Sequence, residues 1–543
     1  MNKKRLITLV LVVLMLLSTV LAGCSKDNGT PSANPTETPA NSSDPEVVTP
    51  VVKEEVEISI ALWDLSEFAN DEVGQAIADK LKVKITPISL SWDNDVEQIK
   101  LFAATNTMPD VVSTYTVDDP ARFYSWIDQE VTRAIPDSMI AKYPNLQSVF
   151  DNSVVGNAVK EIKGEYRYIP RPGSKDNIYQ ANQQAIYYRK DWLANVGITK
   201  VPETMDEFYE MLKAFKEKDP DQDGTPNTYG FTAAKMLPLT TFFASFGVDP
   251  ESWIQDAEGK WKPAYISDAN IEPLKYFQKL YKDGLMDPEF STSGYKQVIQ
   301  KLTANTFGSM VRNADVHWLN KTINSMYGEA NPTVEDPLTV LGVMGPLKKD
   351  SASEAKWPLF LDAGGSEINS QVSDEKLDRI LELYDFLLSD EGKTLLRYGI
   401  EDKHYKMNGD KIELINDPET GEPYAMSVKF PSVILGCLSD WDWDNDADPN
   451  SLVDITQEYK DLGETVRGMY NAAALDQNLA VRYISTPTKD TLTISFQDSF
   501  TQMIISDEDI ETAFPKFVDD CMAKDLGKAI DEVNAIVLEK GIK

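Results

Sequence analysis

Two kinds of periodicity alternate along residues 56–113 and predict a parallel α/β unit. Three short runs alternate apolar with small or polar side chains, as strands do, at 56–62, 83–86 and 110–113. The two stretches between them have helical spacing, with Val73, Ile77 and Leu81 on one predicted apolar face and Val96, Ile99 and Ala103 on the other. Strands joined by such helices run parallel with right-handed crossovers. The pattern therefore predicts a βαβαβ unit.

A second α/β pattern begins near Ala185 and predicts a second lobe. Residues 185–188 are expected to form a strand, and a capping box formed by Thr204 and Glu207 starts a helix. That helix should bury Met205, Phe208, Leu212 and Phe215, and further helices are expected at 273–281 and 295–303. No GxGxxG, Walker or GxSxG sequence lies where a strand meets a helix, so nucleotide chemistry has no support.

The carboxyl ends of the first three strands carry the leading candidates for ligand binding. Ligands bind outside the carboxyl ends of strands in open parallel sheets. The candidates there are Trp63, Asp64, Trp92, Asp93, Ser113 and Tyr115. Core packing is the alternative for the rings, and capping of the next helix is the alternative for the two aspartates.

Four further tryptophans are weaker candidates for contact with a ligand. Trp253 and Trp318 fall in predicted loops or element ends, and Trp441 and Trp443 lie among acids in the turn-rich segment 439–444. An exposed aromatic loop of this kind could reach over a cleft, or its rings could fold back onto the protein.

Residues 219–230 (DPDQDGTPNTYG) begin as a calcium loop does. Asp219, Asp221 and Asp223 occupy positions one, three and five, and a glycine occupies position six. Position twelve, normally a bidentate glutamate, is Gly230, and residues 229–232 look like a strand and not a second helix. We therefore expect a structural calcium site and not a sensor, with an acidic turn that binds no metal as the alternative.

The amino terminus predicts export and a lipid anchor. Three basic residues precede an apolar run that ends in Leu21-Ala-Gly-Cys24, which is a lipobox. Signal peptidase would remove residues 1–23, and diacylation of Cys24 would hold the chain on the outer face of the cell membrane. The alternative is an ordinary signal peptide followed by an incidental cysteine. Residues 24–54 then form a proline-spaced polar linker that cannot build a core.

The composition of the chain limits the kinds of partner and metal centre that it can have. The net charge of −34 disfavours nucleic acid as a partner. It also mildly disfavours a highly anionic glycan unless calcium or local arginines such as Arg167, Arg171 and Arg189 compensate. Two histidines and three cysteines leave no histidine- or cysteine-rich metal centre, so any metal is oxygen-bound. Cys437 and Cys521 could form one disulfide or remain thiols.

Several motifs together resemble the family 1 extracellular solute-binding lipoproteins of carbohydrate ABC transporters. They are the lipobox, residues 164–170 (GEYRYIP), 185–193 (AIYYRKDWL), the aspartate loop, 389–392 (SDEG) and 398–405 (YGIEDKHY). In pattern the chain is most similar to the large Gram-positive subgroup, which also resembles the alginate-binding proteins. The resemblance covers most of the mature chain.

The resemblance implies a two-lobed α/β fold of the type II periplasmic-binding kind. Lobe 1 would comprise residues 55–183 and 363–408, and lobe 2 residues 184–362 and 409–543, with crossings at 170–185, near 361–365 and soon after Tyr405. By matching positions, the Thr225 carbonyl and Asn227 would join the three aspartates around calcium.

The resemblance also implies a monomeric receptor, not an enzyme, that binds an oligosaccharide and passes it to the permease subunits of an ABC transporter. A closing cleft needs no chemistry, and flat aromatic rings with polar groups around them suit sugars. The alternatives are an exported polysaccharide lyase or glycoside hydrolase, whose paired carboxylates could hide among 87 acidic residues, and a binding protein for a non-sugar solute.

Overall fold

The computed structural model describes residues 53–542 except 67, 69, 92–93, 118–119, 173–180, 226, 360–363, 410, 422, 425, 440–454 and 476–477. Several sequence predictions therefore lie outside the described residues. They concern Cys24, most of the linker, Trp92, Asp93, Trp441, Trp443 and most of the crossing near 361–365.

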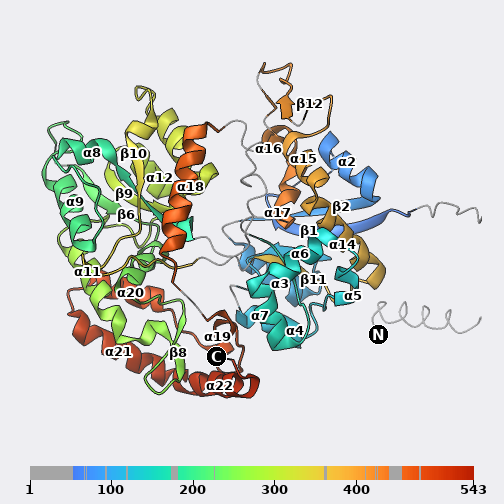
Figure 1. Ribbon diagram of the computed structural model, residues 1–543. Coiled ribbons are helices and arrows are strands. Elements are labelled where there is room, and N and C mark those ends of the chain that lie inside the picture. The colour runs from blue at the N-terminus through green and yellow to red at the C-terminus, as the bar shows by residue number, and fades with distance from the viewer. Residues whose placement is uncertain are drawn as a thin grey trace, which may run out of the picture. The chain divides into compact units, whose positions relative to one another are not determined.

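The first sheet has five strands in the order β2-β1-β3-β11-β4. Figure 1 labels β1, β2 and β11 of this sheet. Its strands are β1 (Val56–Trp63), β2 (Val83–Leu90), β3 (Val111–Thr114), β4 (Ile169–Pro170) and β11 (Gly365–Ile368). β1 pairs in parallel with both β2 and β3, which confirms the predicted βαβαβ unit, while β11 runs antiparallel to β3 and β4. The carboxyl ends of β1, β2, β3 and β4 therefore share one edge with the start of β11.

Of the two helices that connect these strands, one buries its predicted apolar face and the other does not. In α2 (Glu72–Leu81) the residues Val73, Ile77 and Leu81 are buried, as predicted. In α3 (Asp95–Thr105) only Ile99 is buried, and Val96 is 40% exposed. Apolar residues lie on several sides of α3, so its sequence does not define a single buried face.

The first core also includes a late segment of the chain. α14 (Asp374–Leu388) packs on β1 and on α17 (Gly436–Ser439), and Phe430, Val433, Leu435 and Leu438 belong to this core. The predicted lobe 2 begins again at residue 409, and for residues 430–438 this prediction is wrong. The apolar pattern of this short segment does not reveal which of two cores it joins. The other elements in this part of the chain are α4 (Pro120–Asp128), α5 (Asp137–Ile140), α6 (Pro144–Asn152), α7 (Val154–Lys163), α15 (Asp390–Tyr398), β12 (Tyr405–Asn408), β13 (Lys411–Leu414) and α16 (Met426–Lys429).

The second sheet has four strands in the order β10-β5-β9-β6. They are β5 (Ala185–Arg189), β6 (Tyr229–Thr232), β9 (Phe307–Arg312) and β10 (Leu341–Met344). β5 runs antiparallel to both β10 and β9, whereas β6 is parallel to β9. The end of β9, the end of β6 and the start of β5 therefore lie at the same edge.

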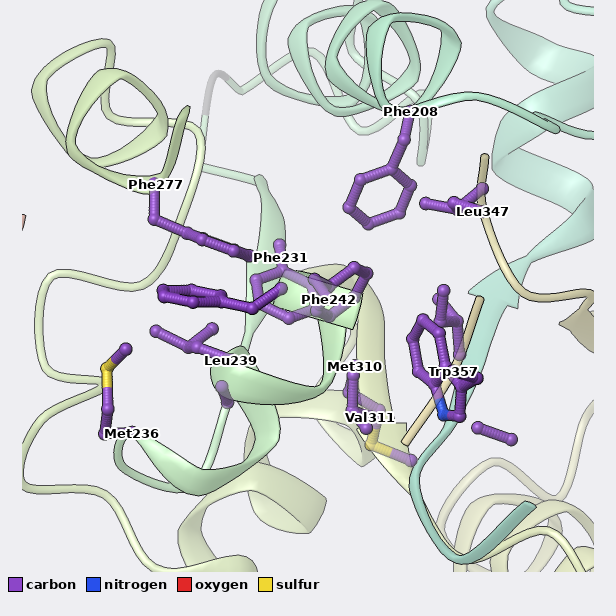
Figure 2. Close-up of a cluster of buried hydrophobic side chains, with 14 of the residues drawn as sticks. Phe208, Phe231, Met236, Leu239, Phe242, Phe277, Met310, Val311, Leu347 and Trp357 are labelled. Carbon is purple, nitrogen blue, oxygen red and sulfur yellow. The ribbon is translucent and has the colours of Figure 1, made fainter. Parts of the chain in front are cut away.

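Aromatic side chains fill the core beside this sheet (Figure 2). Phe208 of α9 (Met205–Glu217) stacks on Phe242, with ring centroids 5.7 Å apart, and Phe242 meets Trp357 edge to face at 5.3 Å. The capping box of Thr204 and Glu207 forms as predicted, and Met205, Phe208, Leu212 and Phe215 are all buried. The other elements here are α8 (Lys190–Asn195), α10 (Leu237–Thr240), β7 (Trp253–Gln255), β8 (Trp261–Pro263), α11 (Ile271–Lys282), α12 (Tyr295–Thr303) and α13 (Val316–Asn320).

The carboxyl-terminal helices extend the second core. α20 (Phe496–Ile505) packs on α11, and α21 (Ile510–Ala523) and α22 (Leu526–Lys540) complete this layer, after α18 (Gln457–Ala472) and α19 (Leu479–Arg482). Cys521 lies in this core and Cys437 against the first one, so the two cysteines do not form a disulfide with each other. Among the helices described, none has the length and apolar character needed to cross a bilayer.

Candidate functional site

Trp63 and Tyr115 meet at the strand-end edge of the first sheet. Trp63 ends β1 and is only 2% exposed, and its indole N–H donates to Asp95 Oδ2 at 3.0 Å. Tyr115 directly follows β3, its ring centroid lies 5.1 Å from that of Trp63, and it is 41% exposed. Tyr115 therefore offers open ring surface to a ligand, and the buried Trp63 ring packs against it at an interplanar angle of 51°.

Arg171 joins this pair from the end of β4. It is 1% exposed, and its guanidinium carbon lies 5.6 Å from the centre of the Trp63 ring. The guanidinium donates to the carbonyls of Thr114 and Cys437 at 3.4 and 3.2 Å, and to Ser113 Oγ at 3.5 Å. Ser113 is fully buried, so in this structure it faces Arg171 and not solvent.

Asp64 is exposed beside this cluster. It adopts a left-handed conformation with φ of 58°, which aspartate tolerates and which turns the chain away from the end of β1. Asp71, not Asp64, caps α2, because Asp71 Oδ1 accepts the N–H of Gly74 at 2.8 Å. Asp64 thus does not serve as the cap of the following helix.

Trp318 lies at the corresponding edge of the second sheet. Asp315 Oδ1 accepts the backbone N–H of Trp318 at 2.8 Å and caps the start of α13. The Arg312 guanidinium lies 4.4 Å from the centre of the Trp318 ring, and Lys321 Nζ lies 4.5 Å from it. Burial lowers the pKa of Arg312, which ends β9, although Tyr187, Tyr295 and Asp315 oppose this effect. Trp318 is half-buried between two cations.

Trp253 occupies a different environment. It begins β7, is 9% exposed and belongs to the second core, with Lys489 Nζ 5.4 Å from its ring centre. Burial lowers the pKa of Lys489 to about 8. The structure brings Trp253 to the base of a two-stranded hairpin, where little of its ring is open to a ligand.

The aspartate loop gathers its three carboxylates as a metal site would. One oxygen from each of Asp219, Asp221 and Asp223 lies within 4.8 Å of the others. Asp219 Oδ1 and Asp221 Oδ1 are buried without a hydrogen-bond partner among the described residues. Burial and the charge of Asp223 raise the pKa of Asp221. Calcium takes carboxylate oxygens as ligands, and a buried carboxylate oxygen without a hydrogen-bond partner needs a cation, so the residues fit this ion.

The remaining loop residues show how the turn is held. Asp223 Oδ1 accepts the N–H of Thr225 at 2.7 Å, and Asp223 Oδ2 accepts from the Asn227 side chain at 3.2 Å. A Cβ at Gly230 would lie 2.6 Å from Leu212 Cβ and 2.8 Å from the Leu285 carbonyl. Position twelve is glycine because the loop returns directly against α9, where no acidic side chain fits.

Three cations lie at these edges beside aromatic rings and are not among the ligand contacts predicted from the sequence, namely Arg171, Arg312 and Lys321. The sequence pattern points to rings and acids next to predicted strands, and these three residues are neither. Two arginines could have been found from the sequence by their positions, one directly after β4 and one at the end of β9. A charged side chain is rarely buried inside a sheet without a partner, so an arginine at a strand end is a candidate for contact with a ligand.

Two bacterial proteins are similar in sequence to this chain over most of its length. It is 24% identical over 440 residues to the polygalacturonan/rhamnogalacturonan-binding protein YtcQ of Bacillus subtilis, which covers 78% of this chain and 77% of the relative. It is also 24% identical over 409 residues to the fructooligosaccharide ABC transporter substrate-binding protein FusA of Streptococcus pneumoniae, covering 69% of this chain and 71% of FusA.

Solved structures share the fold. The alginate-binding protein AlgQ2 without calcium ion superposes with a TM-score of 0.66 at 17% identity, covering 88% of this chain and 97% of AlgQ2. A FusA EF-hand mutant in complex with fructo-nystose gives a TM-score of 0.63 at 16% identity, covering 90% and 99%. The two helix-flanked sheets are thus the lobes of a type II periplasmic-binding fold. Since the bacterial extracellular solute-binding protein model also matches residues 64–394, well over half of the chain, this protein belongs to that family.

Proposed function

We propose that this protein is an extracellular receptor that binds an oligosaccharide between its two lobes and delivers it, unmodified, to the permease subunits of an ABC transporter. The observation that carries the proposal is the exposed Tyr115 ring, backed by Trp63 and Arg171 at the strand-end edge of the first sheet. The names of YtcQ and FusA, both of which refer to saccharide polymers or oligomers, support the ligand class.

Such a cluster suits a sugar for physical reasons. A pyranose or furanose presents apolar C–H groups on its faces, which stack on an aromatic ring, and hydroxyl groups on its rim. Asp64, which directly follows Trp63 and is exposed, supplies acceptor oxygens for those hydroxyls. A two-lobed receptor gains contacts from its second lobe only when it closes, which lets it capture a ligand and later release it.

The first experiment is a thermal-shift screen of residues 25–543 against a panel of neutral and acidic oligosaccharides, followed by product analysis of every hit. A ligand that binds only the folded state must raise Tm. We expect a shift with the sugar recovered at its original length. Shortened products would support the lyase or hydrolase alternative, and a panel without any shift would contradict the carbohydrate proposal.

We further propose that the aspartate loop binds calcium as a structural ion. The carboxylates of Asp219, Asp221 and Asp223, the Thr225 carbonyl and the Asn227 side chain would hold it. The unpartnered buried oxygens of Asp219 and Asp221 support this, as does the shared fold with FusA, a protein solved also as an EF-hand mutant. When bound, the ion would neutralise the three carboxylates and fix the connection between α9 and β6.

The lipid anchor is proposed from the lipobox alone, since Cys24 lies outside the described residues. A chain expressed in a Gram-positive host with labelled palmitate should incorporate the label and fractionate with membranes. Cys24→Ser should abolish both and release the protein. Label retained by Cys24→Ser would contradict this attachment site.

A further inference from the structure

Arg312 differs from the other buried arginines of the described chain. Four arginines there are buried, namely Arg122, Arg171, Arg189 and Arg312. Arg122 donates to Glu367 and Thr116, Arg171 to two carbonyls and a hydroxyl, and Arg189 to Asp191 and Asn305.

The side chain of Arg312, a residue that is 8% exposed, makes no hydrogen bond and no ion pair with any described residue, and its Nε is sealed from solvent. Its contact is the Trp318 ring, 4.4 Å away. An aromatic ring attracts a cation but accepts none of the five N–H groups in the manner of an oxygen. A buried guanidinium left in this state is costly, which points to a ligand that completes it.

Lys321 places a second cation at the same ring. Its Nζ lies 4.5 Å from the centre of Trp318, the side chain is half-buried, and within the described chain no carboxylate pairs with it. Acidic residues outnumber basic ones in this protein, with 87 Asp and Glu against 53 Lys and Arg. A shortage of acids therefore does not explain why neither cation beside this indole forms an ion pair with a described carboxylate.

Arg312, Trp318 and Lys321 lie at the carboxyl end of β9, and neighbouring elements hold this region in place. Arg312 pairs in the sheet with Ala185, the first residue of β5, so it lies where the chain enters the second lobe. α13 rests on α18 at Gly463, where a Cβ would lie 2.4 Å from Val316 Cγ2. A π-helical stretch, η5 (Lys321–Gly328), begins at Lys321, and wide turns of this kind are frequent at functional sites.

We propose that Arg312 and Lys321, gathered on Trp318, form a subsite for the carboxylate of an acidic sugar, so that the transported oligosaccharide contains uronic acid residues. This inference rests on the carbohydrate-receptor function proposed above and specifies its substrate class. A carboxylate accepts two parallel N–H bonds from a guanidinium, which fits Arg312, and Lys321 adds a point charge.

Among the described residues, Asp315 is the acid that acts electrostatically on Arg312. It attracts Arg312 electrostatically, but its Oδ1 accepts the backbone N–H of Trp318, and no ion pair joins the side chains of Asp315 and Arg312. Asp315 therefore starts α13 and leaves the guanidinium hydrogen bonds to another acceptor. With Arg312 and Lys321 against Asp315, these three side chains carry a net positive charge.

The test compares acidic oligosaccharides with their neutral counterparts by calorimetric titration of residues 25–543. The probes are trimers of galacturonate, mannuronate and guluronate, the same trimers after carboxyl reduction, and inorganic sulfate. We expect at least one uronate trimer to bind and its reduced form to bind about 10- to 100-fold more weakly, as for loss of a charge-assisted hydrogen bond. Sulfate should compete only weakly if the site reads a carboxylate on a sugar, and strongly if it is a general anion site, which would overturn the proposal.

Variants separate binding from folding. Arg312→Gln should weaken the uronate trimer about 10- to 100-fold and leave Tm unchanged or higher, because it removes an uncompensated buried charge. Lys321→Gln, at a half-exposed position, should weaken it about threefold. Arg467→Gln is the matched control, since Arg467 pairs with Glu464 on α18 and should bind as the parent does.

The outcomes of these titrations distinguish a failure of the acidic-sugar subsite from a failure of the carbohydrate-receptor function. If Arg312→Gln lowers Tm while affinity stays the same, Arg312 is a structural residue and the proposal is wrong. If the reduced trimers bind as tightly as the acids, the carbohydrate receptor survives and only the acidic-sugar subsite fails. If neither the acidic nor the neutral sugars bind, both proposals fail together.

Discussion

Calcium and the carboxylates of its loop should have opposite effects on stability, and the substitution Asp221→Asn exposes the difference. Oxygens of Asp219, Asp221 and Asp223 lie within 4.8 Å of one another, and burial together with Asp223 raises the pKa of Asp221. Without calcium these groups repel. Asp221→Asn should therefore be as stable as the parent, or more stable, in EDTA, and less stable than the parent in calcium.

The size of the calcium effect follows from linkage. An extracellular loop without the glutamate at position twelve should bind weakly, with a Kd of about 10⁻⁴–10⁻³ M. At a calcium concentration about 100 times Kd, the free energy of unfolding rises by about 2.7 kcal/mol. For a folded unit spanning residues 54–543, the unfolding entropy makes this a rise in Tm of about 3 °C.

Scanning calorimetry of the parent and of Asp221→Asn, each in calcium and in EDTA, gives the four Tm values that are compared. Asp256→Asn is the control, because Asp256 accepts the N–H groups of Glu258 and Lys260 in an acidic turn elsewhere. It should lower Tm by the same amount in both buffers. Equal losses for Asp221→Asn in calcium and EDTA, or a parent Tm that ignores calcium, would refute the metal site.

Three further predictions concern packing, ligand contact and pH. Gly230→Ala should lower the free energy of unfolding by about 1–3 kcal/mol in chemical denaturation, since its Cβ would lie 2.6 Å from Leu212 Cβ. Tyr115→Ala should abolish most oligosaccharide binding in titrations with Tm kept within a few degrees, whereas Trp63→Ala, at a 2% exposed position, should also lose about 3–5 kcal/mol of stability. Burial raises the pKa of Asp249 to about 6, so its contribution to stability is full below pH 4 and is lost as pH rises through 6. Denaturation curves at pH 4 and 7 should show this fall, at most about 3 kcal/mol, in the parent and not in Asp249→Asn.

These three predictions fail on different observations. Unchanged stability of Gly230→Ala would mean that α9 can move away from the loop. Full binding by Tyr115→Ala would place the ligand away from the first-sheet edge. A pH profile that is identical for the parent and Asp249→Asn would mean that this carboxyl has an ordinary pKa in the folded protein.

Local patterns predicted most of the first βαβαβ unit because strands and helices bury residues at different spacings. β1 alternates so clearly that its end at Trp63 could be placed to within one residue. α3 shows the limit, since its apolar residues point in several directions and Val96 is exposed. Residues 430–438 show another limit, because two cores of similar composition compete for the same short apolar segment.

Site residues were harder to predict than elements because their role depends on what surrounds them. Trp63 and Tyr115 were both selected, but the sequence could not tell that one is buried and the other exposed. The aspartate loop was predictable because all its donors come from one short segment. Arg312 was missed because its distinction is the absence of a partner among the described residues, which only the folded surroundings reveal.

The negative net charge of the chain does not conflict with a cationic subsite for an acidic sugar, because exposed charges and buried charges act on a bound ligand over different distances. At physiological salt, exposed charges are largely screened beyond about 8 Å, so the net charge of −34 has little effect inside a closed site. Of the arginines that could have compensated, Arg189 is held by Asp191 and Arg167 by Glu165. Arg312 is not held in this way by any described residue, and its burial keeps its field unscreened. What decides affinity for an anion is therefore the small number of cations that the fold keeps away from its own acids, and not the charge of the chain.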